Sequence, residues 1–329
     1  MDYRGTQVLV TGAAGFIGSH LVEELLSRGA NVRALYQYNS RSQRGWLAAL
    51  DKDGRLEMVA GDVRDPQQCD QMVSGVDVVF HLAALIGIPY SYLAPASYIE
   101  TNIKGTLNIA NAWRSHQDPP VFIQMSTSEV YGSAVYIPMD EGHVLQPQSP
   151  YSASKIGADA LVKSYSLSYG LPSVIARPFN NYGPRQSPRA VIPTIIAQAL
   201  SGAKEIRLGN LEAIRDFVFV KDTCRIIADL AKSPDAVGET VNIGTGHSLT
   251  IRELCELIGT TMGVQLKLCS ENTRIRPEQS EVDRLECNNA KLETLIPDPA
   301  FTLLRDGIKQ TVDWFADQDK LDSARDYHV

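Results

Sequence analysis

The stretch Thr11-Gly12-Ala13-Ala14-Gly15-Phe16-Ile17-Gly18 decides the fold, because of the segments on either side of it. The apolar run Gln7–Val10 before it is typical of a buried strand, and Ser19–Arg28 after it has helical spacing. Glycines permit a tight turn and a close approach of the backbone to a pyrophosphate, which the N–H groups at a helix N-terminus can bind. The stretch therefore predicts a dinucleotide-binding turn. The expected contacts are Gly12, Gly15, Phe16, Ile17 and Gly18.

Strand-like and helix-like segments continue to alternate beyond this turn. Helical spacing occupies Tyr98–Trp113 and Pro150–Tyr169. The strand candidates are short apolar runs at Val32–Tyr36, Leu56–Ala60, Val76–Ala83, Val121–Ser126 and Ser173–Arg177. Apolar strands that alternate with helices predict a parallel sheet covered on both faces. We therefore expect an α/β fold with a doubly wound Rossmann sheet over residues 1–178.

The composition changes after residue 178. Asn180–Arg189 is rich in Pro, Gly and Asn, which predicts a loop. Further helices are expected near Val191–Ser201 and Ile251–Met262, and further strands at Phe217–Val220 and Thr240–Ile243. We expect a smaller α/β substrate domain over residues 179–329. A segment near 216–243 is expected to return to the first sheet.

Charge and cysteine usage exclude several classes of partner. The chain has 31 basic and 38 acidic residues, a net charge of −7, which argues against nucleic acid or an anionic membrane surface. Its start has no signal-peptide pattern, and no apolar run approaches the ~20 residues of a membrane helix. The five cysteines are an odd number at wide spacing, without a C-x-x-C pair. We expect reduced thiols in a cytoplasmic protein, with no metal site.

The adenosine end of a dinucleotide site is less clear in the sequence. The acidic residue that would bind a ribose 2′-hydroxyl at the end of the second strand is missing, and Tyr36 stands there instead. Asn39, Ser40 and Arg41 follow, and an uncharged site beside an arginine suits a 2′-phosphate, which favours NADP over NAD. After the next strand, Asp62-Val63 can accept from the adenine amino group. A helix cap or a turn remains the alternative for Asp62.

Tyr151 and Lys155 form a second constellation at the start of a predicted helix. A spacing of four residues places both side chains on one helix face. The lysine charge is expected to lower the pKa of the tyrosine, so that Tyr151 acts as a general base. Lys155 can also bond the ribose of a nicotinamide. Together with the glycine turn, this pair predicts redox chemistry on a hydroxyl group.

Thr127, Ser128 and Glu129 directly follow the strand candidate Val121–Ser126. In open α/β sheets, ligands bind at the carboxyl ends of the strands. Three polar side chains in succession at such a place predict contacts with a substrate. A Ser/Thr turn with a capping glutamate is the alternative that remains open.

Further motifs give the chain a family resemblance that covers nearly its whole length. These are His81-Leu82-Ala83-Ala84, Asn102-x-x-Gly105-Thr106, Arg177-Pro178-Phe179-Asn180, Tyr182-Gly183-Pro184-Arg185, Arg215-Asp216-Phe217 and Asn242-Ile243-Gly244. Together with the earlier motifs, they resemble the extended short-chain dehydrogenases/reductases of the nucleotide-sugar epimerase/dehydratase family. The segments Tyr38–Arg41, Ile88–Tyr92 and Arg189–Thr194 resemble one subgroup. That subgroup is the N-acetylglucosamine nucleotide 4,6-dehydratases of legionaminic-acid-type pathways.

The resemblance implies roles for particular residues. Thr127 matches the hydroxyl that bonds the sugar O4, and Ser128 and Glu129 match the pair that handles elimination. The Thr-Ser-Glu sequence resembles GDP-mannose dehydratases but also occurs in uronate decarboxylases and some epimerases. His81 is interpreted as structural. The remaining cofactor contacts are Val63, Leu82, Ala83, Ala84, Asn102 and Pro178, and the remaining substrate contacts are Asn180, Val191, Arg215 and Arg276.

The resemblance also implies a reaction. Tyr151 takes the proton of the sugar 4-hydroxyl as hydride leaves C4, Glu129 removes the C5 proton, water is lost, and hydride returns to C6. The cofactor, NAD or NADP, would be regenerated and stay tightly bound. We expect a homodimer with a four-helix interface built from Tyr98–Trp113 and Pro150–Tyr169 of each subunit.

Three alternatives stay open. A 4-epimerase needs no base at C5, so Glu129 counts against it. A uronate decarboxylase would need a cation for the sugar carboxylate, and the sequence identifies none. A non-catalytic dinucleotide sensor is the remote alternative, and the intact Tyr151, Lys155 and Glu129 count against it.

Overall fold

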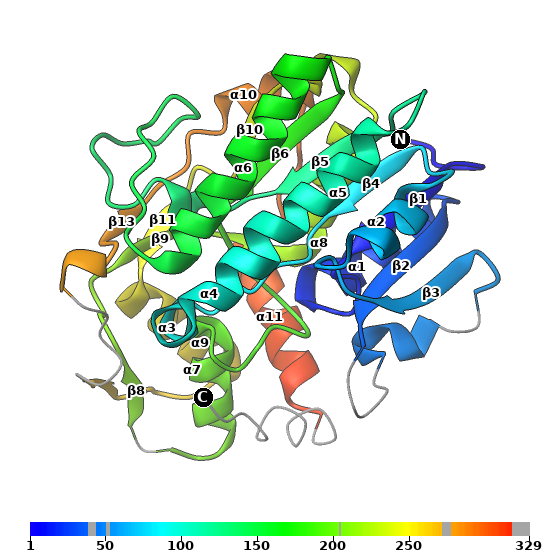
Figure 1. Cartoon of the computed structure of the whole chain (residues 1–329). Coiled ribbons are helices and arrows are strands. Elements are labelled where there is room, and N and C mark those ends of the chain that lie inside the picture. The colour runs from blue at the N-terminus through cyan, green and yellow to red at the C-terminus, as the bar shows by residue number, and fades with distance from the viewer. Residues whose placement is uncertain (39–43, 51–52, 204, 272–277, 318–329) are drawn as a thin grey trace.

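A computed structural model describes residues 1–38, 44–50, 53–203, 205–271 and 278–317 of the chain (Figure 1). Its centre is a seven-stranded parallel sheet with the strand order β10-β6-β5-β4-β1-β2-β3. The strands are β1 (Gln7–Thr11), β2 (Asn31–Gln37), β3 (Leu56–Gly61), β4 (Val78–His81), β5 (Val121–Met125), β6 (Ser173–Pro178) and β10 (Thr240–Ile243). The predicted doubly wound sheet is confirmed. The strand order reverses beside β1, so the carboxyl ends of β1 and β4 open onto one crevice.

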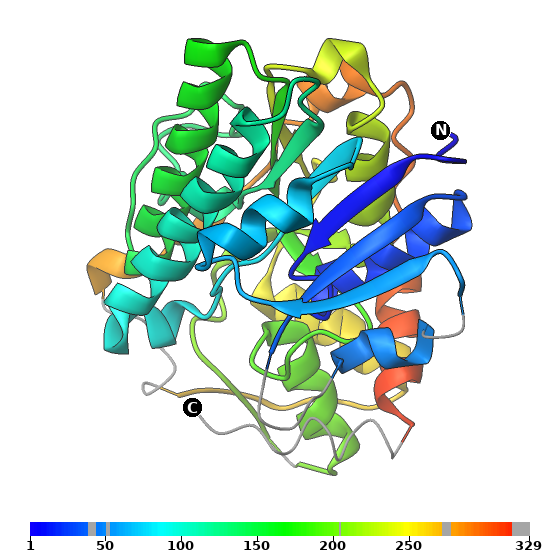
Figure 2. The same ribbon diagram turned by 45° about the vertical axis from the view of Figure 1, so that its right-hand side comes forward.

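Helices cover both faces of this sheet, as Figures 1 and 2 show. They are α1 (Phe16–Ser27), α2 (Pro66–Val73), α5 (Gly105–Arg114), α6 (Pro150–Tyr169) and α8 (Val220–Leu230). Successive strand residues point to opposite faces. On β1, Val8 and Val10 pack in the core that holds α1 and α8, whereas Leu9 packs with α2, α5 and α6. The near-continuous apolar strands of the sequence therefore serve two cores.

A second layer with its own core holds much of the C-terminal half. Its sheet joins β9 (Ile214–Phe219) to β7 (Asn180–Tyr182), β11 (Ser248–Thr250) and β13 (Arg284–Leu285). A two-stranded sheet pairs β8 (Ile206–Leu208) with β12 (Leu268–Ser270). The helices of this layer are α7 (Val191–Leu200), α9 (Ile251–Met262) and α11 (Leu304–Phe315), whereas α10 (Ala290–Leu295) packs in the first core beside β10. Side chains of α7, α9 and α11 pack on β9 in the second core. The division of the chain into domains at residue 178 stays a prediction.

Strand β10 leaves this C-terminal half and joins the first sheet. It pairs in parallel with β6, with Thr240 opposite Ile175 and Ile243 opposite Pro178. The predicted strand Thr240–Ile243 therefore returns to the large sheet, as expected. This return brings Asn242 beside the strands that carry the candidate site.

Three sequence predictions need correction. Asn180–Arg189 is not all loop, because Asn180–Tyr182 forms β7, which pairs with β9. Strand β9 ends at Phe219, and Val220 begins α8, which the sequence analysis missed together with α2. The β7–β9 pairing joins segments far apart in the sequence, so local composition does not reveal it.

The predicted helix Tyr98–Trp113 is not one regular helix. It consists of α4 (Pro95–Tyr98), a π-helical turn at Ile99–Lys104 and α5, after the short helix α3 (Ile88–Leu93). A π-helical turn is uncommon and often lies at a functional site. This turn carries Asn102, one of the expected site residues.

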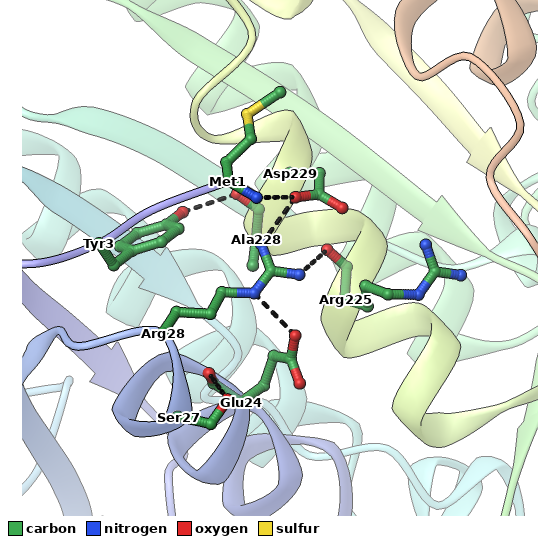
Figure 3. A network of polar contacts seen from close by, with 8 residues as sticks. All are labelled: Met1, Tyr3, Glu24, Ser27, Arg28, Arg225, Ala228 and Asp229. Atoms are coloured by element: carbon green, nitrogen blue, oxygen red, sulfur yellow. Dashed lines mark hydrogen bonds and ion pairs between the residues drawn. The ribbon is translucent and has the colours of Figure 1, made fainter.

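Figure 3 shows how the start of the chain is anchored to α8. Arg28 donates to the Asp229 carboxylate at 2.6 Å and to Glu24 at 2.7 Å. The Met1 amino group lies 3.3 Å from Asp229, and the Tyr3 hydroxyl donates to the Ala228 carbonyl. These contacts join α1 to α8 on one face of the sheet, away from Tyr151 and Lys155.

Two further expectations concern composition. All five cysteines are free thiols in the structure, which agrees with the prediction. Within the described ranges, no helix has the length and apolar character needed to cross a bilayer.

Candidate active site

The glycine turn is shaped by close backbone contacts. Gly12 has a φ of 68°, and a Cβ there would stand 2.9 Å from the Ala83 nitrogen. A Cβ on Gly18 would overlap the Gly12 carbonyl oxygen, and Gly15 is the N-cap of α1. The first N–H groups of a helix have no intrahelical partner and attract an anion. Side chains at Gly12 and Gly18 would clash with the backbone that forms this turn. The glycines therefore permit the tight turn that presents the N–H groups of α1, and this arrangement fits the pyrophosphate of a dinucleotide.

A chain of hydrogen bonds holds the end of β4 beside this turn. Thr11 Oγ1 accepts from the backbone N–H groups of Leu82 and Ala83, at 3.1 and 3.0 Å. Its hydroxyl lies 2.9 Å from His81 Nδ1, and His81 Nε2 lies 3.0 Å from the Thr106 hydroxyl. Burial and the Lys155 charge lower the pKa of His81 to about 3. His81 is therefore an uncharged side chain that connects Thr11 to Thr106 through hydrogen bonds, which agrees with its interpretation as a structural residue.

Asn102 connects the end of β4 to α6. Its side-chain oxygen accepts from the Leu85 N–H at 2.8 Å, and its amide group donates to the Leu85 carbonyl and to Ser154 Oγ. Ser154 lies between Tyr151 and Lys155 in α6. The amide of Asn102 therefore positions the Tyr-Lys helix. The contact that we expect between Asn102 and the cofactor stays a prediction.

Tyr151 lies in the first turn of α6, which begins with a capping box. The Ser149 hydroxyl accepts from the Ser152 N–H, Ser152 returns a bond to the Ser149 N–H, and Pro150 occupies the first helical position. Tyr151 is 7% exposed, and the Tyr98 ring packs edge-on against it at 6.3 Å between centroids. The helix start is thus locally encoded and presents the phenol in a nearly closed space.

The pKa of Tyr151 moves in the direction opposite to our expectation. Burial raises it above its ordinary value, and the charge of Glu129 raises it further, while a hydrogen bond with Thr127 lowers it. Lys155 Nζ donates to the Met125 carbonyl at 2.6 Å. The expected lowering of the pKa of Tyr151 by Lys155 is therefore not borne out in this arrangement, where burial raises that pKa and the hydrogen bond with Thr127 lowers it.

The three residues after β5 lie next to this tyrosine. Thr127 is the N-cap of a 3-10 turn, Ser128–Val130, and its hydroxyl accepts from the Glu129 N–H at 3.2 Å. The turn with a Thr cap, which we had considered as the alternative, is therefore present. Because Thr127 also bonds Tyr151 and the charge of Glu129 acts on the phenol, the structure brings both predicted groups together.

The adenosine end has a hollow at the carboxyl ends of β2 and β3. Its volume is about 530 Å³, and Gln37, Tyr38, Ala60, Gly61, Asp62, Arg64 and Gln68 line it. Asp62 accepts from the Arg64 N–H at 2.9 Å and pairs with its guanidinium at 2.5 Å, so its carboxylate closes a turn. Asp65, not Asp62, caps α2.

Other expected cofactor contacts lie around this end. The Val63 carbonyl accepts from Asn108 in α5, and Tyr36 is not among the lining residues of the hollow. Asn39, Ser40 and Arg41 lie outside the described residues. Arg64 was not predicted as a lining residue, because the turn of Asp62 uses only the backbone N–H two residues on and the pattern does not single out an arginine side chain.

The expected substrate contacts are distributed over the second layer. Asn180 lies on β7, and its side-chain oxygen is buried without a hydrogen-bond partner among the described residues. Val191 begins α7. The Arg215 guanidinium donates to the carbonyls of Ile214, Val282 and Asp283. Arg276 lies outside the described residues, and the diphosphate contact of Arg215 stays a prediction.

One cation near Tyr151 was missed in the sequence. Arg189 Nη1 lies 3.3 Å from the position of a Cβ on Gly87. The Gly87 carbonyl accepts from the Tyr98 hydroxyl at 2.5 Å, and Tyr98 packs on Tyr151. Arg189 therefore approaches the wall of the site from the loop before α7. Only the fold brings this loop to α4, so no local signal reveals it.

Comparison with known proteins shows which family the chain belongs to. Residues 9–302 match the model of the GDP-mannose 4,6 dehydratase family. The chain belongs to this family. A dTDP-glucose 4,6-dehydratase from an Actinoplanes species is 34% identical over 94% of this chain and 97% of its own length. The resemblance drawn from the sequence motifs is thus confirmed at the level of the NAD-dependent epimerase/dehydratase family.

Solved structures of family members agree. A dTDP-glucose 4,6-dehydratase double mutant from Streptomyces venezuelae, solved with NAD bound, has a TM-score of 0.83 and 33% identity, covering 95% of this chain and 98% of its own. A UDP-N-acetylglucosamine 4-epimerase from Methanobrevibacter ruminantium M1, in complex with UDP-N-acetylmuramic acid, has a TM-score of 0.86 and 30% identity, covering 97% and 100%. The chain is therefore an enzyme of a family that includes nucleotide-sugar 4,6-dehydratases and 4-epimerases.

Proposed function

We propose that the chain is a nucleotide-sugar 4,6-dehydratase that converts an NDP-hexose to its 4-keto-6-deoxy form. The observation that carries the proposal is the position of Glu129, whose charge acts on Tyr151 while its backbone is bound to Thr127. A second base beside the phenol is what an elimination at C5 needs. A 4-epimerase needs no base at C5, so Glu129 counts against it although the Thr-Ser-Glu sequence also occurs in some epimerases. A dinucleotide sensor would need neither group.

The cofactor that we propose is a tightly held NAD or NADP. Its pyrophosphate would lie on Gly12, Gly15 and the first turn of α1, and Lys155 would bond the ribose next to the nicotinamide. When bound, the nicotinamide supplies the acceptor and later the donor of a hydride. The solved dehydratase with NAD favours NAD, whereas Tyr36 at the end of β2 favours NADP.

The first step belongs to Tyr151. Its phenolate oxygen takes the proton of the sugar 4-hydroxyl while Thr127 holds the sugar O4, so that hydride can leave C4. Burial disfavours the charged phenolate, so the Thr127 hydrogen bond, which lowers the pKa of Tyr151, is part of the activation.

The second step belongs to Glu129 and Ser128. The 4-ketone makes the C5 proton acidic, and the Glu129 carboxylate removes it. The 6-hydroxyl then leaves as water, with the proton supplied by Glu129 or Ser128. When hydride returns to C6, C5 takes a proton from solvent, and Tyr151 releases to solvent the proton that it took from the 4-hydroxyl. Holding both groups on one capped 3-10 turn provides the orientation that such a sequence of proton transfers requires.

For the sugar, we propose an N-acetylglucosamine nucleotide. The support is the resemblance of Ile88–Tyr92 and Arg189–Thr194 to that subgroup. In the structure these segments form α3 and the start of α7, and Ile88 packs with Tyr98 and Tyr151. The sugar-binding wall would thus come from the segments that carry the resemblance.

Arg189 favours a second candidate, a uronate decarboxylase or uronate 4-epimerase. Either reaction places a carboxylate on C6 of the sugar, and a cation near Tyr151 could bind it. Incubation with a panel of nucleotide sugars, followed by mass spectrometry, separates the reactions. Loss of one water supports the dehydratase, an unchanged mass with a new stereoisomer supports an epimerase, and loss of carbon dioxide supports the decarboxylase. A chain without product from any sugar would support the sensor.

The cofactor proposal has its own test. Because the reaction returns its hydride, we expect the purified protein to release a dinucleotide on denaturation, and mass spectrometry of the supernatant shows whether it carries a 2′-phosphate. Absence of any dinucleotide, together with no binding of NAD or NADP by titration calorimetry, would contradict the proposal.

We also propose a homodimer built on α5 and α6. These helices lie side by side on one face of the sheet (Figure 1), and the exposed Leu167 and Tyr169 lie at the end of α6. Light scattering coupled to gel filtration measures the mass directly. A monomer at micromolar concentration would reject this assembly.

A further inference from the structure

Helix α6 carries a third residue on the face that bears Tyr151 and Lys155. Asp159 follows Lys155 by four residues, as Lys155 follows Tyr151, so all three lie along one stripe of the helix. Asp159 is 3% exposed and Lys155 is 5% exposed. The proposed reaction has no step for this carboxylate, yet a buried charge is costly to keep without a reason.

The contacts of Asp159 lead back to the lysine. Its Oδ2 accepts from Ser126 Oγ at 2.6 Å, and Ser126 directly follows Met125, whose carbonyl accepts from Lys155 Nζ at 2.6 Å. Two consecutive residues at the end of β5 therefore hold the lysine and the aspartate. Asp159 Oδ1 has no hydrogen-bond partner among the described residues.

The same carboxylate also connects to the elimination segment. Arg177 in β6 donates from Nη2 and Nε to Asp159 Oδ2, at 3.2 and 3.4 Å. Its Nη1 donates to the Tyr131 hydroxyl at 3.2 Å, and its guanidinium lies 5.1 Å from the centroid of the Tyr131 ring. Tyr131 is the C-cap of the 3-10 turn that holds Ser128 and Glu129. Its hydroxyl in turn donates to Asn242 on β10 at 2.7 Å.

We propose that Asp159 is a positioning residue that joins the two halves of the site. Its hydrogen bond from Ser126 places its carboxylate near the Lys155 ammonium, with which it makes no direct ion pair among the described residues. Through Arg177 and Tyr131 it holds the Ser128–Glu129 turn against Tyr151. The inference rests on the proposed roles of Tyr151 and Lys155, and it is independent of which sugar is bound.

Burial raises the pKa of Asp159, and the charges of Arg177 and Lys155 oppose this by favouring its carboxylate form. Burial lowers the pKa of Lys155 and the charge of Asp159 raises it. The charge of Asp159 also raises the pKa of Tyr151, after the larger effect of burial. The other ionisable groups around this cluster are Arg177 on β6, Glu129 and Tyr131 on the 3-10 turn and its cap, Glu141 near Tyr131, Tyr98 on α4 against Tyr151, and His81 on β4.

Asp159→Asn tests the proposal with little change in shape. Removing the negative charge lowers the pKa of both Lys155 and Tyr151, so both limbs of the pH profile of kcat/KM move to lower pH. A unit charge near a titrating group in a protein interior shifts the pKa of that group by on the order of one unit. We therefore expect both limbs of the pH profile to move by about one pH unit. Dinucleotide affinity, followed by titration calorimetry against pH, should fall at lower pH in the variant than in the wild type.

Asp229→Asn is the matched control. It breaks an Arg–Asp pair of the same kind on α8, away from Tyr151. We expect a lower melting temperature with an unmoved pH profile. A rate loss in Asp159→Asn that is equal at every pH, with an unmoved calorimetric pH dependence, would overturn the proposal and leave Asp159 a purely structural residue. Wild-type behaviour in both measurements would overturn it as well.

Two further variants keep the inference testable. If Asp159→Asn does not fold, the double variant Asp159→Asn/Arg177→Gln leaves neither charge buried alone. A smaller shift in the same direction is expected, because loss of the Arg177 cation opposes the effect of losing Asp159. Tyr131→Phe removes the link to the turn only. It should slow product formation at least about tenfold while stopped-flow absorbance shows nicotinamide reduction within about twofold of wild type. Equal slowing of both steps would contradict the link to the Glu129 turn.

Failure of the proposed function is distinguishable from failure of this inference. A wild-type protein that makes no 6-deoxy product fails as a dehydratase. The calorimetric pH dependence of dinucleotide binding still reports on Lys155 and Asp159 in that protein.

Discussion

Two Arg–Asp pairs occupy opposite regions of this molecule and differ in what surrounds them. Arg28 and Asp229 lie 2.6 Å apart, with side chains 12% and 14% exposed, and join α1 to α8 (Figure 3). Arg177 and Asp159 lie 3.2 Å apart, with side chains 7% and 4% exposed, and join β6 to α6. The shorter pair has other charged partners nearby, including Glu24 and the Met1 amino group. The longer pair shares its surroundings with Lys155 and Tyr151.

The comparison shows that the N–O distance of an ion pair does not predict how much the protein loses when one partner is removed. Arg28 retains Glu24 if Asp229 is lost, whereas the described ion pairs give Arg177 only Asp159. In a nearly dry site, an unpaired charge costs far more than it does near water. We therefore expect the Arg177–Asp159 pair to affect both the stability of the fold and proton transfer in the site. The Arg28–Asp229 pair of Figure 3 should affect stability alone.

The largest effect is expected from the catalytic neighbours of the buried pair. Glu129→Gln keeps nearly the same shape but cannot accept the C5 proton, so dehydration should fall by ~10²–10⁴-fold. Oxidation at C4 remains possible, so the near-ultraviolet absorbance of reduced nicotinamide should accumulate on addition of substrate. Tyr151→Phe, the control, should show neither product nor this absorbance. Product formation by Glu129→Gln at the wild-type rate would make a 4-epimerase the leading hypothesis.

Stability tests the comparison between the two pairs directly. Asp159→Asn leaves the Arg177 guanidinium buried and uncompensated, which should cost about 3–5 kcal/mol of unfolding free energy. Asp229→Asn removes one partner of Arg28 and should cost about 1–2 kcal/mol, because Glu24 remains. Urea unfolding with an unchanged m-value measures both. Equal losses would contradict the argument that burial separates the pairs.

A third contact, Glu23 with Arg185, should show the smallest effect and a characteristic pH dependence. Burial would raise the pKa of Glu23, but the hydrogen bond from Arg185 and the charges of Arg185 and of His20, 3.7 Å away, lower it to about 2. A carboxyl whose folded pKa is depressed stabilises the fold above its unfolded pKa and loses that stabilisation as the pH falls through the folded one.

Glu23→Gln therefore should cost about 1 kcal/mol at neutral pH, a value reduced by solvent because a third of the side chain is exposed. The difference from wild type should vanish as the pH falls from 4.5 to about 2. Melting curves across that range measure it. A difference that is constant with pH would show that packing, not charge, is responsible.

Much of the candidate site was predictable because its signals are local. The glycine turn depends on contacts between Gly12, Gly15 and Gly18, all within seven residues of one another, apart from the nearby backbone of Ala83. The spacing of Tyr151 and Lys155 specifies one helix face wherever the helix lies. The alternation of apolar strands and helices likewise predicted the parallel sheet and its covered faces.

Other features depend on segments that are distant in the sequence. The loop composition of Asn180–Tyr182 concealed β7, because its partner β9 lies some forty residues further on. The guanidinium of Arg215 bonds the carbonyl of Asp283, and Arg189 lies beside Gly87, which is far from it in the sequence. No local pattern contains such pairings, since they follow from how the layers pack.

The sequence by itself determined the sheet, the dinucleotide turn, and the identity of the Tyr-Lys and Thr-Ser-Glu groups, because short-range backbone geometry encodes each of them. Only the tertiary structure decided how these groups are charged. Burial raises the pKa of Tyr151, whereas the charge of Lys155 was expected to lower it. Lys155 donates to a carbonyl on β5, and the charge of the nearby Asp159 acts on it. The physical reason is that desolvation and Coulomb energy depend on distance through space, which the order of residues along the chain does not contain.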